Sequence, residues 1–222
     1  MLNERSGAML LLFCALALPR GWAAGNELAY SEGDVTLVRQ ARTIEAEPGL
    51  ALFQGDTLRT GRDGLAIIKL ARGAEIKVRE NTSLDLDGLE ANVSLTLRAG
   101  GVFSKVDKLL GSRYTIRTES AVAGVRGTEF FVAYGRTIDL KPDVWLCVND
   151  GSVEVAIVES GEKVVVEEGK GINIIGGTRL TAPRGYAWTR RLNWNTDPSG
   201  GSVFDKTDLD QAYSDLLDQD YE

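Results

Sequence analysis

The sequence predicts an all-β fold, arranged as an antiparallel β-sandwich or roll of many short hairpins, with a short β-helix as the alternative. Between Val35 and Ile175, short runs rich in β-branched residues alternate with turns that contain glycine or aspartate. No helical period longer than two turns appears in this stretch. The runs recur at uneven intervals, whereas a regular solenoid needs a fixed repeat, so the sandwich is favoured.

Residues 1–23 have the layout of a secretory signal peptide. Arg5 precedes an apolar run from Ala8 to Leu18, and small residues follow at Ala23 and Ala24. The run is shorter than the roughly 20 residues that a membrane-spanning helix needs. We therefore expect export, a periplasmic or secreted location, and no stable membrane insertion of the mature chain.

The first strands form two predicted hairpins. The run Leu65–Leu70 is followed by Glu75–Val78, in which charged and apolar residues alternate as in a half-buried strand. Ser83–Asp87 and Val93–Arg98 alternate in the same way. Asp87-Gly88 supplies turn residues between them, which predicts a second hairpin.

The next strands are predicted at Val102–Val106 and Tyr114–Thr118, on either side of a loop. Farther along, Asp150-Gly151 lies between the apolar runs Val144–Val148 and Val153–Val158. An Asp-Gly pair between two such runs is a strong hairpin signal, so we predict that these two strands pair with each other.

The chain is divided by these patterns into the signal peptide 1–23, a β domain 24–178, an irregular strap 179–202, and an acidic segment 203–222. The strap is rich in aromatic and basic residues. In the acidic segment, Leu209, Tyr213 and Leu216 fall on one face of a predicted short amphipathic helix. Such a helix is marginal alone, so we expect it to dock on the β domain or bind a partner.

The strap carries a second set of candidate partner-binding residues. Its aromatic and basic side chains are interleaved, namely Trp188, Arg190, Arg191 and Trp194. Such a stretch could bind a peptide or stack against a sugar. The alternative is that the two tryptophans pin the strap onto the β domain.

The segment Arg126-Gly127-Thr128 predicts a tight turn directly before an apolar strand. Gly127 can adopt the positive φ that such a turn requires. Arg126 either anchors the turn or binds an anionic ligand or a partner. Thr128, a third candidate for partner binding, is expected to satisfy the local backbone through its hydroxyl.

Composition excludes several functions. The chain has no histidine, which removes the usual general base, zinc ligand and activator of serine or cysteine nucleophiles. The formal net charge of −7 argues against nucleic acid as a partner. Cys147, the only thiol outside the signal peptide, is predicted to be a buried core residue. We predict no enzyme activity, no cofactor and no metal site, with a glycan hydrolase using carboxylates such as Glu167 as the weaker alternative.

Two motifs resemble the FecR domain, the periplasmic part of the iron-dicitrate transmembrane regulator. They are Gly55-Asp56-Thr57-Leu58-Arg59-Thr60 and the segment Val125–Val132, which contains Arg-Gly-Thr followed by Phe130. The resemblance covers about residues 50–177 and implies a β domain of the cell envelope that senses a ligand or partner. In that regulator a cytoplasmic segment and a transmembrane helix precede the domain, whereas this sequence has an export signal there.

The predicted function is therefore a non-catalytic, extracytoplasmic sensing or protein-interaction module in envelope signalling or assembly. Its predicted partner is an envelope protein. The alternative is a protein that binds a cell-wall polymer or polysaccharide.

Overall fold

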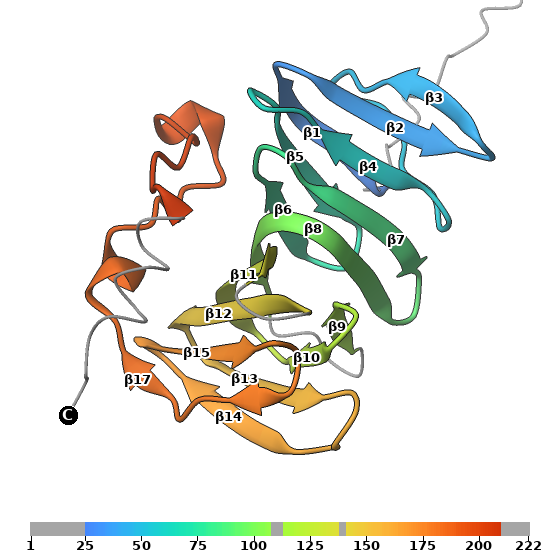
Figure 1. The fold of residues 1–222 in the computed structure, drawn as a ribbon. Coiled ribbons are helices and arrows are strands. Elements are labelled where there is room, and N and C mark those ends of the chain that lie inside the picture. The colour runs from blue at the N-terminus through green and yellow to red at the C-terminus, as the bar shows by residue number, and fades with distance from the viewer. Residues whose placement is uncertain (1–24, 108–112, 138–140, 210–222) are drawn as a thin grey trace, which may run out of the picture.

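The computed structural model describes residues 25–107, 113–137 and 141–209, and these residues form two β-sheets that pack face to face (Figure 1). The predicted all-β class is thus confirmed. One long strand, β8 (Val93–Val106), belongs to both sheets, because its first half pairs in sheet B and its second half in sheet A. At the bend, Gly100 has a φ of +90°, and a Cβ there would lie 2.2 Å from Thr82 Oγ1, so only glycine fits.

Sheet A contains, in pairing order, β1 (Glu27–Glu32), β5 (Leu65–Leu70), β6 (Ala74–Val78), the second half of β8, β11 (Thr128–Thr137), β12 (Pro142–Asp150) and β15 (Lys170–Ile175). The short strands β16 (Arg179–Leu180) and β17 (Arg184–Gly185) pair with the far side of β15.

Sheet B contains, in pairing order, β3 (Arg42–Glu45), β2 (Val35–Arg39), β4 (Thr57–Thr60), β7 (Ser83–Leu89), the first half of β8, β9 (Tyr114–Arg117), β10 (Ala121–Val125), β13 (Ser152–Ile157) and β14 (Lys163–Glu167). Among the described strands, β8 and β9 are the one parallel pair, which departs from the purely antiparallel prediction.

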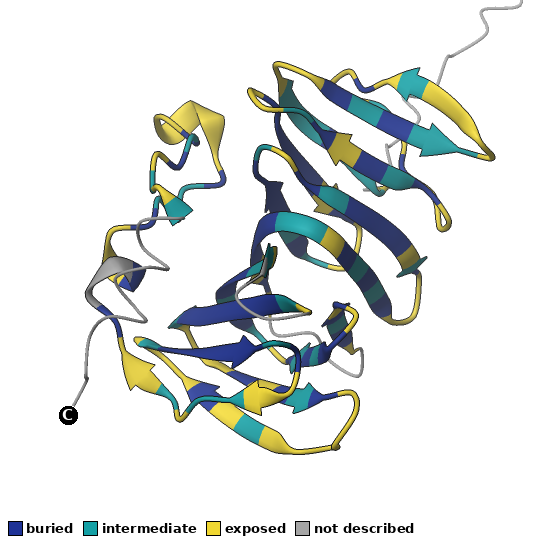
Figure 2. Ribbon diagram, in the orientation of Figure 1, coloured by how far each residue is buried: buried dark blue, intermediate teal, exposed yellow. Residues whose placement is uncertain are grey.

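The inner faces of the two sheets share one large apolar core. Alternate residues of each strand point into it, for example Ile76 from sheet A and Leu95 from sheet B, both with no exposed surface (Figure 2). Tyr114 is also fully buried there, and its ring packs edge-on against Phe130 with 6.1 Å between the ring centres. Its hydroxyl shares a 2.8 Å hydrogen bond with Ser104 Oγ, so the buried polar group is satisfied.

The outer face of sheet A is covered by the strap and by residues 203–209, drawn in orange and red in Figure 1. The strap includes the short 3₁₀ helices η1 (Ala187–Arg190) and η2 (Pro198–Gly200). Two apolar clusters hold this layer in place. The first joins Phe103, Phe131, Trp145 and Cys147 of the sheet to Tyr186 and Leu192 of the strap, and the second joins Leu65 and Ile67 to Val203.

Two of the predicted hairpins involve the correct strands. Strands β5 and β6 pair as expected. Strands β7 and β8 also pair, but the turn predicted at Asp87-Gly88 is wrong. Gly88 lies inside β7, opposite Ser94, and the chain reverses at residues 90–92 instead. The irregular pairing between Leu86 and Gly88 explains how the strand accommodates the glycine and continues.

The hairpin predicted across Asp150-Gly151 is wrong. Strand β12 pairs with β11 and β15 in sheet A, whereas β13 pairs with β10 and β14 in sheet B. The chain crosses from one sheet to the other at Gly151, whose φ is +82°. A turn residue fixes the local backbone angle, but it does not determine which sheet receives the next strand.

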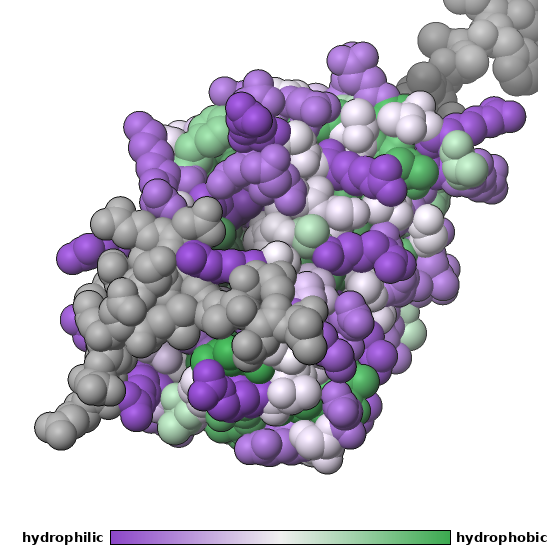
Figure 3. Space-filling model, viewed as in Figure 1, coloured by the Kyte–Doolittle hydropathy of each residue, from purple (hydrophilic) through white to green (hydrophobic). Residues whose placement is uncertain are grey.

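The face shown in Figure 3 has hydrophilic side chains distributed around small, separate hydrophobic areas. Within the described parts of the chain, no helix is both long and apolar enough to cross a membrane.

Candidate interaction surface

A groove crosses the outer face of sheet B, over strands β9, β10, β13 and β14. Its volume is about 740 Å³. The lining residues come from four neighbouring strands and their ends, and they are Arg113, Tyr114, Thr115, Val122, Gly124, Val125, Arg126, Ser152, Glu154, Ala156, Lys163 and Val165.

Small side chains at central positions create this groove. In the paired strands β10 and β13, Val122 lies opposite Ala156, and Gly124 lies opposite Glu154. A Cβ on Gly124 would meet no heavy atom within 4 Å, so the space above it is open. Val165, on the adjoining strand β14, leaves 53% of its surface exposed. The groove therefore presents a short apolar strip of Val122, Ala156 and Val165, beside the ion pair that Glu154 forms with Lys163 at 3.1 Å.

Arg126 lies at one end of the groove, where the chain passes from β10 in sheet B to β11 in sheet A. Gly127 forms this corner with a φ of +72°, as the sequence predicts. Arg126 is exposed, and among the described residues its side chain has no hydrogen-bond or ion-pair partner. An unengaged guanidinium beside an apolar strip can bind a carboxylate of another molecule, because its N–H groups donate hydrogen bonds to the carboxylate oxygens.

Thr128, the next residue, has a different position. It is 2% exposed, and its Oγ1 donates a 2.9 Å hydrogen bond to the carbonyl of Ser152. This bond ties the start of β11 to the start of β13. Thr128 thus supports the corner that presents Arg126 and has almost no surface of its own.

The other motif of the resemblance also stabilises a corner. Asp56 is 1% exposed, and it accepts hydrogen bonds from Arg39 Nε at 2.7 Å and Arg39 Nη2 at 2.6 Å. It also accepts a 2.8 Å bond from the backbone N–H of Phe53. A buried carboxylate with this many donors orders the loop before β4.

The strap residues predicted to bind partners lie on the opposite side of the molecule, over sheet A. Trp194 packs edge-on against Phe103 at 5.2 Å, and its Nε1 donates to the carbonyl of Thr189 at 3.0 Å. Arg190 and Arg191 are exposed. Trp188 belongs to η1, but its side chain lies outside the described part of the structure. The structure therefore does not bring these residues together with Arg126.

A buried lysine that the sequence did not single out holds the strap. Lys77 of β6 has no exposed surface, and its Nζ donates to the carbonyls of Asn193 and Asn195, the latter at 2.9 Å. The ammonium also lies 4.2 Å from the ring centre of Phe103. Burial lowers the pKa of Lys77 from 10.5 to about 8. The two acceptors are backbone carbonyls, so Lys77 fixes the path of the strap at residues 193–195. The Asn193 side chain ties this segment to the next one, because its Nδ2 donates to the carbonyls of Ser202 at 2.8 Å and Phe204 at 2.9 Å.

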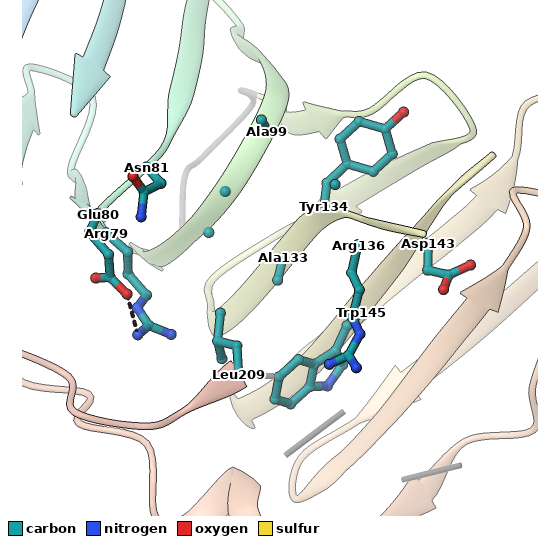
Figure 4. Close-up of a pocket in the computed structure, with 13 residues that line it drawn as sticks. Arg79, Glu80, Asn81, Ala99, Ala133, Tyr134, Arg136, Asp143, Trp145 and Leu209 are labelled. Carbon is teal, nitrogen blue, oxygen red and sulfur yellow. Dashed lines mark hydrogen bonds and ion pairs between the residues drawn. The ribbon is translucent and has the colours of Figure 1, made fainter. Parts of the chain in front are cut away.

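A second, smaller pocket of about 330 Å³ lies beside the bend of β8, between residues 79–81, residues 133–136 and Leu209. Figure 4 shows Arg79 and Glu80 on one side, Trp145 and Arg136 on the other, and Leu209 between them. Arg79 Nη2 donates to Glu80 Oε1 at 2.8 Å and to the carbonyl of Thr207 at 3.1 Å. Arg79 thus joins the end of β6 to residues 205–207, and we assign these contacts at the pocket to stabilising the fold. Tyr213 and Leu216 of the predicted helix lie outside the described residues.

Three side chains with catalytic chemistry, Asp85, Glu167 and Cys147, are engaged in bonds within the chain or buried. Asp85 accepts from Thr57 Oγ1 at 2.8 Å and from Arg98 Nε at 2.5 Å. Glu167 pairs with Lys170 at 2.7 Å, and this hydrogen bond lowers the pKa of Glu167. Cys147 has no exposed surface, and burial raises the pKa of its thiol, so it is the core residue predicted. Within the described ranges, no three acidic or cysteine side chains gather as a metal site would require.

Comparisons with known proteins address the fold and family. A family model described as FecR protein matches residues 56–170, which is more than half of the chain. Two crystal structures of a proposed anti-sigma factor from Parabacteroides distasonis, at 1.65 Å and 2.50 Å resolution, have similar folds, with TM-scores of 0.54 and 0.53. Each is 18% identical, over 72% of this chain and 72% of the other. No curated protein matches the chain with statistical significance.

Proposed function

Because the chain belongs to the FecR protein family, we propose that it is a non-catalytic regulatory module that binds an envelope protein outside the cytoplasm. The binding site in this proposal is the groove on sheet B. A regulatory role also agrees with the description of the Parabacteroides distasonis protein, whose likeness to this chain concerns the fold.

The observation that carries the proposal is the unengaged Arg126 at the end of an open apolar groove. Its position comes from the Arg-Gly-Thr corner, which lies within the family match. An apolar strip with a charged group at its rim is typical of a protein-binding surface. Binding removes the apolar surface of the strip from water, and the charged group fixes the orientation of the partner. The partner in this proposal contributes an apolar segment with an acidic side chain placed to meet Arg126.

The same surface favours a protein over a glycan. Sugars are commonly held by exposed aromatic rings, and the one aromatic residue among the described groove residues, Tyr114, is fully buried. A hydrolase is disfavoured because Asp85 and Glu167 are committed to structural partners.

Two substitutions test this assignment while sparing the fold. Gly124→Leu places a larger side chain in the groove, at a position where a Cβ would meet no heavy atom within 4 Å. Arg126→Glu reverses the charge at its rim. Arg42→Glu is the matched control, because Arg42 is exposed on β3, at the opposite edge of the same sheet.

We expect a photo-crosslinking amino acid placed at Thr115 to capture an envelope protein in intact cells. Capture should fall at least about tenfold in both groove variants and stay unchanged in Arg42→Glu. Equal capture by Gly124→Leu, Arg126→Glu and the unmodified chain would reject the groove as the binding site. Recovery of wall polymer instead of protein would favour the alternative function, polysaccharide binding.

A further inference from the structure

The ends of the two sheets are protected unequally. The edge strand β1 is covered by residues 49–52, through backbone hydrogen bonds such as Leu28 N–H to the carbonyl of Leu50 at 2.9 Å. The other end of sheet A is covered by β16 and β17. In sheet B, β14 pairs only with β13 among the described strands, and it lies at the lower margin of the molecule in Figure 1. An open edge of this kind can accept another strand.

The hydrogen bonds at the two ends of the β13–β14 pair determine which groups of β14 are unpaired. The N–H of Ile157 donates to the carbonyl of Glu162, and the N–H of Glu168 donates to the carbonyl of Gly151. Both bonds continue the register in which β13 and β14 pair. Bonded and non-bonded pairs alternate in an antiparallel ladder. The N–H and C=O groups of Val164 and Val166 therefore point to β13, whereas those of Lys163, Val165 and Glu167 point away from the sheet.

The five residues of β14, Lys-Val-Val-Val-Glu, are complementary to themselves when reversed. We propose that two copies of this chain associate through antiparallel pairing of their β14 strands, about a two-fold axis at Val165. In this arrangement Val165 faces Val165 of the second copy, and Lys163 faces Glu167 at both ends. About six backbone hydrogen bonds then join the two sheets.

The charges around the edge also fit this arrangement. Lys163 pairs with Glu154 at 3.1 Å, and Glu167 pairs with Lys170 at 2.7 Å. Pairing of two strands places Lys163 between Glu154 and the Glu167 of the second copy. Acidic and basic groups then alternate across the junction, which favours this register over a shifted one.

The side chains of β14 give the association an apolar centre. Val165 is 53% exposed in a single copy and lines the groove, so pairing buries it against its equivalent. The grooves of the two copies then adjoin across the axis. Because the strand is short, we expect a weak, concentration-dependent dimer with a dissociation constant of about 10–100 µM.

Charge exchange tests the pairing directly, by sedimentation velocity on the purified chain between about 1 and 500 µM. Lys163→Glu and Glu167→Lys each place like charges opposite one another, so each should weaken the dimer at least about tenfold. An equimolar mixture of the two variants should form a heterodimer, because every facing pair is then opposite in charge. The double variant Lys163→Glu/Glu167→Lys should dimerise like the unmodified chain.

A backbone test uses Val165→Pro, which removes the outward-pointing N–H, against Val165→Ala, which keeps it. We expect the proline variant to be monomeric and the alanine variant to retain part of the dimer. Circular dichroism and melting temperature confirm that each variant is folded. A chain that stays monomeric at all concentrations, or a dimer that these substitutions leave unchanged, overturns the proposal. Neither result bears on the protein partner of the groove, which the Thr115 crosslink measures separately.

Discussion

The buried Lys77 predicts a specific pH dependence of stability. Its ammonium lies under the strap with no exposed surface, and burial lowers its pKa from 10.5 to about 8. In the unfolded chain the same group has an ordinary lysine pKa. Replacing Lys77 by methionine keeps an unbranched side chain, one atom shorter, and removes the titrating group, so it isolates this effect.

The sign follows from the two pKa values. Below pH 8 both the folded and the unfolded chain carry the charge, and the cost of burying it is fully present. Between pH 8 and 10.5 the folded chain loses the proton while the unfolded chain retains it, so the free energy of unfolding rises with pH. The fall from 10.5 to about 8 corresponds to roughly 3 kcal/mol, of which about 2–3 kcal/mol should be recovered by pH 10.

The measurement is urea unfolding of the unmodified chain and Lys77→Met at pH 7.5, 8.5, 9.5 and 10. The difference between the two proteins is the informative quantity, because Cys147 and Tyr114 titrate in both and cancel. The unmodified chain should gain stability over Lys77→Met across this range. Lys69→Met is the control, since Lys69 pairs with Glu75 at 3.3 Å on the neighbouring strand and is half exposed. Parallel curves for Lys77→Met and the unmodified chain would refute the reasoning.

Two further predictions concern the corner and the core. Gly127→Val should lower the free energy of unfolding by about 1–3 kcal/mol, because a β-branched residue resists a φ of +72°. Gly124→Val is its control in denaturant unfolding, since that extended position has open space, and equal stability of the two variants would contradict the strain argument. At pH 8, Cys147 should react with a thiol reagent at least about a hundredfold more slowly in the folded chain than in denaturant. Rapid labelling of the folded chain would show that the core around Cys147 is open.

Local features of the sequence are sufficient to predict the parts of the fold that depend only on residues close together in the chain. Alternation of apolar residues predicts β5, β6 and β7 close to their observed bounds. The corner at Gly127 follows from the need for a positive φ, and the burial of Cys147 follows from its apolar strand. The FecR family was also predicted from two short motifs, since their residues stabilise corners that the fold requires.

The candidate site was predicted only in part. Arg126 lies on the groove, but Trp194 packs on the far sheet. Lys77 was missed, although its strand alternation places it correctly on the outer face of sheet A. The sequence could not indicate that the strap covers this face, because the contact joins residues more than a hundred positions apart.

The sequence by itself determined that the fold is all-β, where most of the strands lie, and which family the chain resembles. It did not determine every strand end, because the strands predicted at Val93–Arg98 and Val102–Val106 form the single strand β8. The tertiary structure decided which strands pair. Asp150-Gly151 and Ser160-Gly161 are similar turns, yet the first crosses between sheets and the second closes the β13–β14 hairpin. The physical reason is that a turn fixes only a few backbone angles, whereas pairing depends on the burial of whole faces, to which residues from the entire chain contribute.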